Sequence, residues 1–226
     1  MSSTKLPLII ATVLLFSCGQ GKESTSGFVT KELVESSDKL ESQKPQINYS
    51  SQFIDTKYEY SDSLGNNLII ENSLPKGGLK YTAPNGEDYV YAIFWTRIIN
   101  ETTKAVDFTI DFPSDSIELP SSADNYFRVL LPTETMTSDK ESLFNYGLKD
   151  LESLLDKGLY KSPFLQQTIN PCDSNTFYVV TLFNRGLEGT IRTGFSLKDE
   201  HLLYTISNKE IHSGRLSFNQ YPIKKK

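Results

Sequence analysis

The chain has little of the chemistry that most metal and redox sites use: two cysteines and two histidines occur among its 226 residues. The histidines, His201 and His212, form no HExxH pattern, and the cysteines, Cys18 and Cys172, supply no close His/Cys ligand set. The sequence therefore predicts neither a zinc site nor a disulfide framework. We expect no cofactor.

Other signatures are also missing. There is no GxSxG elbow and no glycine-rich phosphate loop, the usual marks of α/β-hydrolases and nucleotide-binding proteins. The formal net charge is −5, and residues 1–17 contain one Lys and no acid, so the remainder carries about −6. Nucleic acid binding needs a basic face. The basic cluster at residues 224–226 is predicted to be a solvated tail, so we expect no nucleic acid partner.

The longest apolar run at the N-terminus is too short to cross a membrane. It covers about 11 residues from Leu6 to Phe16, whereas a spanning helix needs about 20. Lys5 gives a positive start, and a small residue, Ser17, precedes Cys18. This arrangement is typical of a signal peptide. An ordinary secretory peptide cut at another position is the alternative.

The segment from Leu15 to Gly19 (Leu-Phe-Ser-Cys-Gly) resembles the lipobox of bacterial lipoproteins. The resemblance implies that residues 1–17 are removed and that Cys18 becomes a lipidated first residue. Two or three acyl chains would hold the protein at a membrane stably, whereas one chain binds only marginally. Cys172 is then left without a partner in the chain, and we expect a buried or inert thiol, with an intermolecular disulfide as the alternative.

The residues after Cys18 bear on location. Gly19 is not the aspartate that retains lipoproteins in the inner membrane of enteric bacteria, so the resemblance favours the outer membrane, on its periplasmic or cell-surface face. Residues 20–23 (Gln-Gly-Lys-Glu) resemble the surface-export signals of Bacteroidetes lipoproteins. Residues 18–50 are rich in Ser, Thr, Lys, Glu and Gln, a composition that predicts a flexible tether with a reach of roughly 30 Å.

From residue 51 the pattern becomes one of strands and turns. A hairpin is predicted at residues 58–71, with its turn at 62–66. Residues 89–100 form the longest predicted strand, apolar on both faces and therefore covered on both sides. Residues 105–112 alternate between apolar and polar side chains, which predicts one buried and one solvated face. Further strands are expected at 126–131, 177–184, 190–197 and 202–207.

One helix is expected near 139–157. Ser138 and Glu141 have the spacing of a capping box, leucines follow at helical spacing, and Gly158 suits the end of the helix. Strands in hairpin succession with one inserted helix predict a mostly β fold, an antiparallel β-sandwich of the Ig-like type, as a single domain over 51–226. A closed up-and-down barrel is the alternative.

Several residues are candidates for a functional site. Tyr89, Tyr91 and Trp95 repeat at even spacing in the longest strand and could stack on sugar rings, although core packing is the simpler interpretation. His201, beside two acids, is the candidate base of a hydrolytic site assembled from distant segments; a turn histidine is the alternative.

Acidic residues are concentrated between 107 and 124. They suggest either a calcium-binding loop or a solvated face; the residues are Asp107, Asp111, Asp115, Glu118 and Asp124. The sequences at 62–64 and 115–117 resemble the Asp-Ser/Thr-aliphatic acceptor site of Bacteroidetes O-glycosylation. Glycan attachment at these two predicted turns is therefore a further hypothesis.

These observations lead to one main functional hypothesis and two alternatives. We expect a membrane-anchored envelope lipoprotein, a non-catalytic module that engages another envelope protein or a glycan. A surface carbohydrate-binding accessory protein using Tyr89, Tyr91 and Trp95 is the first alternative. A hydrolase using His201 is the second.

Overall fold

The strand β4 (Asp88–Asn100) organises the fold, because neighbours occupy both of its edges and both of its faces. In the computed structural model, β9 (Asp173–Phe183) pairs with most of its length. On the other edge, β2 (Asn67–Ser73) and β3 (Lys76–Thr82) pair with its two halves. The structure describes residues 51–62, 64–113, 116–119, 124–186, 189–218 and 224–225, so the predicted signal peptide, Cys18 and tether lie outside the described residues.

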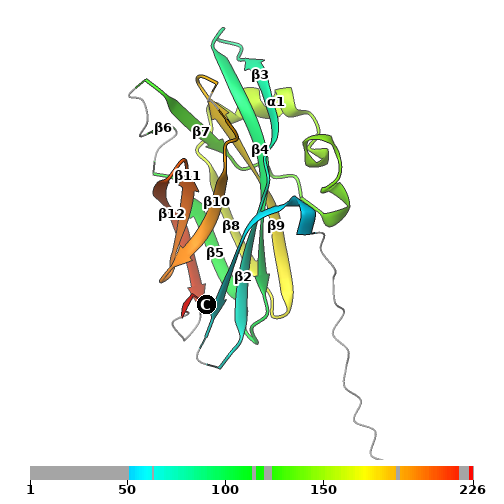
Figure 1. Cartoon of the computed structure of the whole chain (residues 1–226), viewed down its shortest axis with the longest axis vertical. Helices are drawn as coiled ribbons and strands as arrows, with labels where there is room; N and C mark the ends of the chain where they lie inside the picture. Colours follow the sequence, from blue (N-terminus) through cyan, green and yellow to red (C-terminus); the bar gives the residue numbers. More distant parts are fainter. Residues whose placement is uncertain are drawn as a thin grey trace, which may run out of the picture. The chain divides into compact units, whose positions relative to one another are not determined.

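The strands form two antiparallel sheets, which confirms a mostly β, sandwich-like fold (Figure 1). The large sheet has the order β13-β1-β2-β4-β9-β7-β6, with β3 beside β4, and the small sheet has the order β10-β11-β12-β5-β8. The remaining elements of the large sheet are β1 (Ile54–Ser61), β6 (Ile117–Glu118), β7 (Tyr126–Leu130) and β13 (Lys224–Lys225), with the 3-10 turn η1 (Ser51–Phe53) before β1. Those of the small sheet are β5 (Val106–Asp111), β8 (Phe164–Ile169), β10 (Thr193–Lys198), β11 (His201–Ile206) and β12 (Lys209–Phe218).

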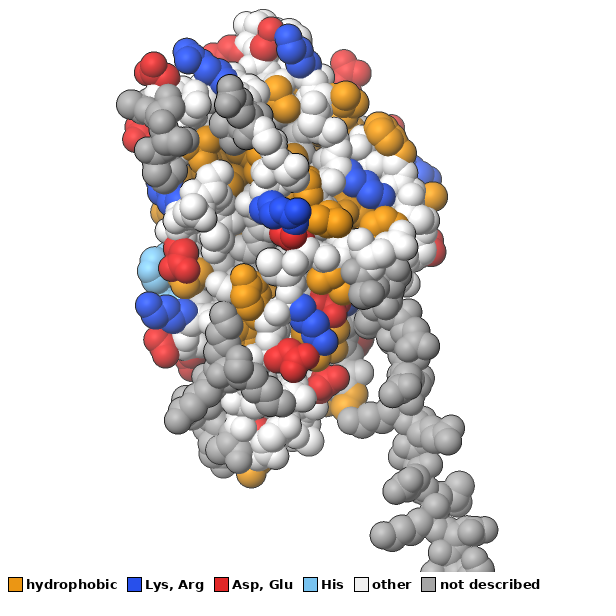
Figure 2. Space-filling model, in the orientation of Figure 1, with side chains coloured by type: hydrophobic (Ala, Val, Ile, Leu, Met, Phe, Trp, Pro, Cys, Tyr) orange, Lys and Arg blue, Asp and Glu red, His pale blue; other side chains and the backbone are white. Residues whose placement is uncertain are grey.

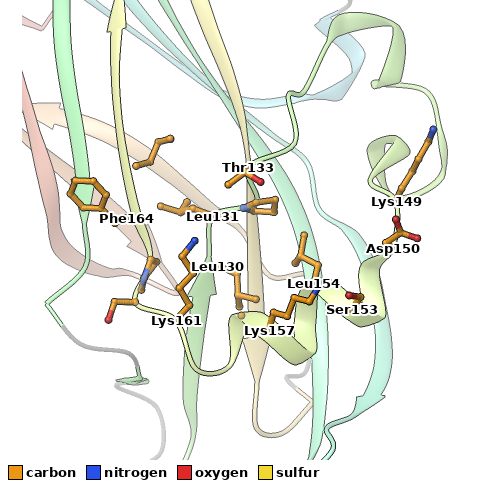
Figure 3. Close-up of a pocket in the computed structure, with 15 residues that line it drawn as sticks. Leu130, Leu131, Thr133, Lys149, Asp150, Ser153, Leu154, Lys157, Lys161 and Phe164 are labelled. Atoms are coloured by element: carbon orange, nitrogen blue, oxygen red, sulfur yellow. The ribbon is translucent and has the colours of Figure 1, made fainter.

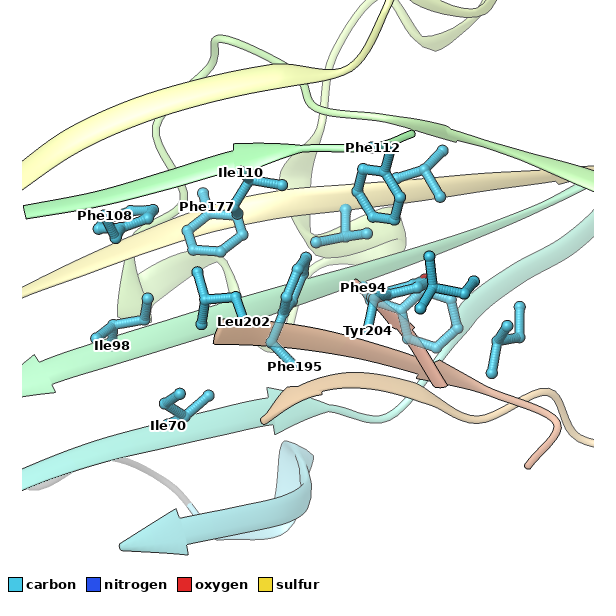
Figure 4. Close-up of a cluster of buried hydrophobic side chains, with 14 of the residues drawn as sticks. Ile70, Phe94, Ile98, Phe108, Ile110, Phe112, Phe177, Phe195, Leu202 and Tyr204 are labelled. Atoms are coloured by element: carbon cyan, nitrogen blue, oxygen red, sulfur yellow. The ribbon is translucent and has the colours of Figure 1, made fainter. Parts of the chain in front are cut away.

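Aromatic side chains fill the space between the two sheets (Figure 4). Phe177 of the large sheet stacks on Phe108 with ring centroids 5.7 Å apart and meets Phe195 edge-on at 5.8 Å. Tyr204 and Phe112 complete this aromatic group at 5.3 Å. Each such ring, fully buried, contributes about 1.5–3 kcal/mol to folding through the hydrophobic effect, so this interior is the main source of cohesion between the sheets.

Two strand predictions are confirmed residue by residue. In β5 the apolar side chains Val106, Phe108 and Ile110 are buried, and the intervening polar ones are exposed or half-buried. In β4, Phe94 faces the core between the sheets, while Trp95 faces a second cluster on the opposite side of the large sheet. That second cluster is covered by the segment that follows β7, including the only α-helix of the described residues.

The helix prediction needs correction at its N-terminal part. Residues 138–150 form two 3-10 turns, η2 (Ser138–Lys140) and η3 (Phe144–Gly147), and α1 spans only Leu151–Gly158. The N-cap residue of η2 is Thr137, not the predicted Ser138, and it makes no side-chain cap bond, while the Glu141 carboxylate pairs with Arg97. Tyr146 is fully buried at a φ of 54°. Tertiary contacts therefore override the local helix pattern. None of the helices in the described part of the chain is long and apolar enough to span a membrane.

One side chain ties the two sheets together where β2 passes β10. The buried Asn72 amide donates to the Phe195 carbonyl at 2.9 Å and accepts from the Phe195 N–H at 2.8 Å, as a backbone peptide would. Thr96 donates its hydroxyl to the same amide oxygen at 2.9 Å. Gly194 permits this approach, because a Cβ there would lie 2.7 Å from the Asn72 Cγ. The contact joins β10, an edge strand of the small sheet, to the interior strand β2 of the large one.

Candidate functional site

A groove of about 370 Å³ lies between α1, the end of β7 and the start of β8; we call it the α1 groove. Its floor is aliphatic, formed by Leu130, Leu131, Pro132, Leu154 and Leu165. Its rim carries the charged residues Lys149, Asp150, Lys157 and Lys161. In Figure 3, Leu130 and Leu131 lie between α1 on one side and Phe164 on the other.

The position of α1 follows from its two apolar stripes. Leu155 is buried against the large sheet, and Leu154, half-buried, turns toward the groove. Gly158 lets the helix end closely approach β7, because a Cβ at this position would lie 1.9 Å from the Leu130 Cδ2. Residues one turn apart share a helix face. Lys157 therefore lies on the same face as Leu154 and Ser153, and all three line the groove. The helix thus presents a mixed apolar and cationic face.

A buried ion network fixes the segment that leads into the rim. The Arg97 guanidinium, 1% exposed, lies 3.0 Å from a Glu71 carboxylate oxygen and also pairs with Glu141. Buried ion pairs contribute little net stability against apolar replacements, but losing one partner costs several kcal/mol. The network therefore fixes the position of Glu141. It also fixes the neighbouring part of residues 131–163, the segment between β7 and β8 that covers the second cluster and that we call the covering segment.

Lys76 strengthens the same attachment. Its ammonium donates to the carbonyls of Glu141 at 2.7 Å and Leu143 at 2.6 Å, and it lies 4.0 Å from the centroid of the Tyr146 ring. Desolvation lowers the pKa of Lys76, and the nearby Glu141 charge opposes that effect. The Tyr146 hydroxyl in turn donates to the Leu74 carbonyl at 2.6 Å. The left-handed turn at Tyr146 is thus fixed by tertiary contacts, as such strained residues require.

Glu134 anchors the rim itself. Its carboxylate accepts a hydrogen bond from the Lys140 ammonium at 2.8 Å and one from the Lys149 backbone N–H at 3.4 Å. The hydrogen bond from Lys140 is the main reason that the pKa of Glu134 lies below its usual range. Because Lys149 is held through its backbone, its ammonium remains at the rim of the groove.

The groove concentrates positive charge on an acidic protein. Three lysines and a single acid, Asp150, occur among the described residues that line it, whereas the chain as a whole carries −5. On the face shown in Figure 2, hydrophobic side chains lie at the surface close to Lys and Arg side chains. Exposed aromatic side chains flank the groove, with Tyr160 75% and Phe164 57% exposed. An apolar floor with a cationic rim can bind an apolar group that carries negative charge.

The aromatic side chains singled out in the sequence do not form an open platform. Trp95 is fully buried, and Tyr89 and Tyr91 are 2% and 6% exposed. Trp95 packs edge-on against Tyr146 at 6.3 Å and under the Arg97 guanidinium at 4.7 Å. These contacts are those of core residues, so a sugar ring has no access to them in this structure.

His201 lies in a second, smaller hollow of about 250 Å³ on the outer face of the small sheet, which we call the histidine pocket. Its ring meets that of His212 edge-on, with centroids 5.4 Å apart. The pocket is lined by Lys198, Asp199, His201, Leu203, Glu210 and His212. None of these described lining residues carries a hydroxyl or thiol nucleophile. The structure thus brings His201 together with acids, as expected, and with a second histidine.

The remaining candidate residues are dispersed. Asp107 accepts a hydrogen bond from the Thr168 hydroxyl at 2.6 Å on the solvated side of the small sheet, while Asp115 and Ser63 lie outside the described residues. Among the described residues, no group of three or more His, Cys, Asp or Glu side chains is placed to hold a metal ion. Cys172 is an exposed free thiol in a turn. Of the expectation of a buried or inert thiol, this corrects the burial.

The α1 groove was not expected from the sequence, although a signal was present. Lys149, Lys157 and Lys161 repeat at spacings of eight and four residues, which would place them on one side of a continuous helix; in the structure only Lys157 lies in α1. In comparisons with known proteins, no family model, no curated protein and no solved structure matches this chain.

Proposed function

We propose that this protein is a membrane-anchored envelope lipoprotein and that its folded domain is a non-catalytic module that binds another envelope protein. The observation that carries the proposal is the α1 groove, with its aliphatic floor and three rim lysines. The occupant is an extended segment of the partner that combines apolar side chains with carboxylates. The anchor is Cys18, and residues 19–50 link it to the domain.

The chemistry of the groove favours a protein segment over a glycan. Sugar rings bind by stacking on open aromatic faces. One open aromatic ring, Phe164, lines the groove, whereas the floor is built from Leu and Pro side chains. Apolar side chains of a peptide fill such a floor, and acidic side chains beside them meet Lys149, Lys157 and Lys161. Complementary charge of this kind speeds association and selects partners.

The adjacent strand β8 offers a second mode of attachment. β8 is the last strand of the small sheet and pairs with β5, leaving its other edge unpaired among the described residues. Phe164 and Leu165, at its start, also line the groove. An extended segment can add to such an edge through main-chain hydrogen bonds while its side chains fill a neighbouring hollow.

Cross-linking from the groove in living cells tests the proposal. A photoreactive phenylalanine analogue at Phe164 is expected to give one reproducible protein adduct, identified by mass spectrometry. The matched control places the same analogue at Leu64, a 73% exposed side chain at the β1–β2 turn. Absence of an adduct from Phe164, or the same adducts from both positions, would refute a protein partner in the groove. A glycan adduct at Phe164 would replace the proposal with a carbohydrate-binding function.

A further inference from the structure

The histidine pocket has no part in the proposed binding function, since it lies on the outer face of the small sheet and α1 covers the large one. We propose that His201 and His212 form a binding site for a divalent transition metal ion such as Zn²⁺. The two side chains come from neighbouring strands, β11 and β12, where His212 lies opposite Leu203, two residues from His201 on the same face.

The separation of the two rings fits shared coordination. A Zn–N bond of about 2.0–2.1 Å places a metal about 3.2 Å from the centroid of each imidazole ring, so two rings bound at the tetrahedral angle have centroids about 5.2 Å apart. The observed centroid distance is 5.4 Å. The centroid distance is therefore compatible with one nitrogen of each ring binding a common ion. Imidazole is a ligand that suits Zn²⁺, Cu²⁺ and Ni²⁺.

The backbone favours a fixed pair. Both strands belong to continuous ladders, with β11 paired to β10 on one side and to β12 on the other. Ser213, directly after His212, is buried in the bulge between β11 and β12 and donates to the Leu202 carbonyl at 3.1 Å. Sites on strands hold their ligands more precisely than sites on loops, so the histidines are prearranged.

The charges around the pair are mixed. Asp199 and Glu210 line the pocket with Lys198, and Arg215 lies opposite His201 across the ladder. Glu210 is on the same strand as His212, two residues away and so on the same face, and can move toward the ion. Since no third ligand is in place among the described residues, water completes the coordination, and we expect weaker binding than at a closed structural zinc site.

Zinc titration of the full chain tests the site. The protein is prepared without a polyhistidine tag and with Cys18→Ser and Cys172→Ser, so that neither a tag nor a thiol competes for the metal. Isothermal calorimetry is expected to show one saturable Zn²⁺ site per chain. His201→Ala and His212→Ala should each weaken Zn²⁺ binding by more than about tenfold. Tenfold is the smaller effect typical of losing a group that only hydrogen-bonds to a metal ligand, so losing a ligand itself should cost more. Asp107→Asn, exposed on the same sheet face but opposite Ser217, five residues along β12 from His212, is the matched control and should leave affinity unchanged.

Two results would overturn the proposal. One is the absence of saturable Zn²⁺ binding. The other is binding that both histidine variants retain, which would assign the metal to other residues. His201 is only half-buried and His212 is exposed, so the variants are expected to fold; unchanged circular dichroism verifies this. A Zn²⁺-dependent shift of both imidazole ring resonances in the parent protein, absent with Mg²⁺, is the supporting spectroscopic result.

Discussion

The buried pair between Arg97 and Glu141 allows a sharp prediction about stability. Glu141→Ala removes one of two carboxylates that face the guanidinium, whose side chain is 1% exposed. Glu71 remains at 3.0 Å, so Arg97 keeps one partner. The substitution also removes the negative charge that favours the protonated form of Lys76. No water reaches the vacated position without opening the covering segment, because Glu141 itself is buried.

The magnitude follows from the loss of one charge-assisted contact to a buried guanidinium that keeps Glu71 as its other partner. A hydrogen bond to a charged group contributes about 1.5–3 kcal/mol to the free energy of unfolding. For a domain of about 150–250 residues, 1 kcal/mol corresponds to about 2–4 °C in Tm, so we expect a decrease of about 3–12 °C. The covering segment is expected to loosen with it, since Glu141 also positions the backbone that Lys76 binds.

Urea unfolding is the assay, and the protein contains its own probe. Trp95, the single tryptophan, is fully buried beside Arg97, so its fluorescence reports unfolding of this region. Glu59→Ala is the matched control, since its pair with Lys57 has side chains 40–46% exposed and exposed pairs contribute only about 0–1 kcal/mol. A loss below about 1 kcal/mol for Glu141→Ala would refute the reasoning that the network fixes the segment.

Three further predictions concern other parts of the molecule. Asn72→Ala should lower the free energy of unfolding in urea by about 2–4 kcal/mol, because it leaves buried Phe195 backbone groups without partners. Gly194→Ala should also destabilise the protein, and wild-type stability of both variants would contradict the role of Asn72 in joining the sheets. Burial raises the pKa of Tyr60, Tyr146 and Tyr204. The stability that these protonated tyrosines contribute is therefore present below pH about 10 and is lost as the pH rises toward their raised pKa values. A urea midpoint unchanged between pH about 9 and about 11 would refute this. Cys18→Ala should move the protein from the membrane fraction to the soluble one, and persistent membrane association would remove the proposed anchor.

The sequence predicts the strands in which apolar residues follow a regular pattern. The two-sided β4 and the alternating β5 were anticipated from their side chains alone. β12 was not, because the bulge near Ser213 breaks its alternation. β8 was missed because its apolar residues, Phe164, Leu165 and Ile169, do not alternate with polar ones. In both cases the strand does not show the alternation of apolar and polar residues that a regular strand with one buried face has.

The candidate site was largely beyond reach of the sequence, for a different reason. The capping-box pattern at Ser138 and Glu141 is real, but the buried Arg97, 44 positions earlier, recruits Glu141 instead. The α1 groove needs three segments that meet only in the fold, and its floor residue Leu130 lies 28 residues before Gly158. The sequence contained the rim lysines, but only the structure shows that they surround one hollow.

The most direct test of the proposed binding function combines the cross-link at Phe164 with charge reversal of the rim. Each exposed lysine contributes about 0.5 kcal/mol to a contact, which is about 1.5 kcal/mol for the three. Lys149→Glu, Lys157→Glu and Lys161→Glu together should therefore lower the adduct yield about tenfold. The control makes the same change in net charge elsewhere, with Lys80→Glu, Lys198→Glu and Arg215→Glu, all exposed. Selective loss with the rim variant is the predicted result. Equal yields from both variants, or equal losses, would contradict a lysine-rimmed protein-binding groove.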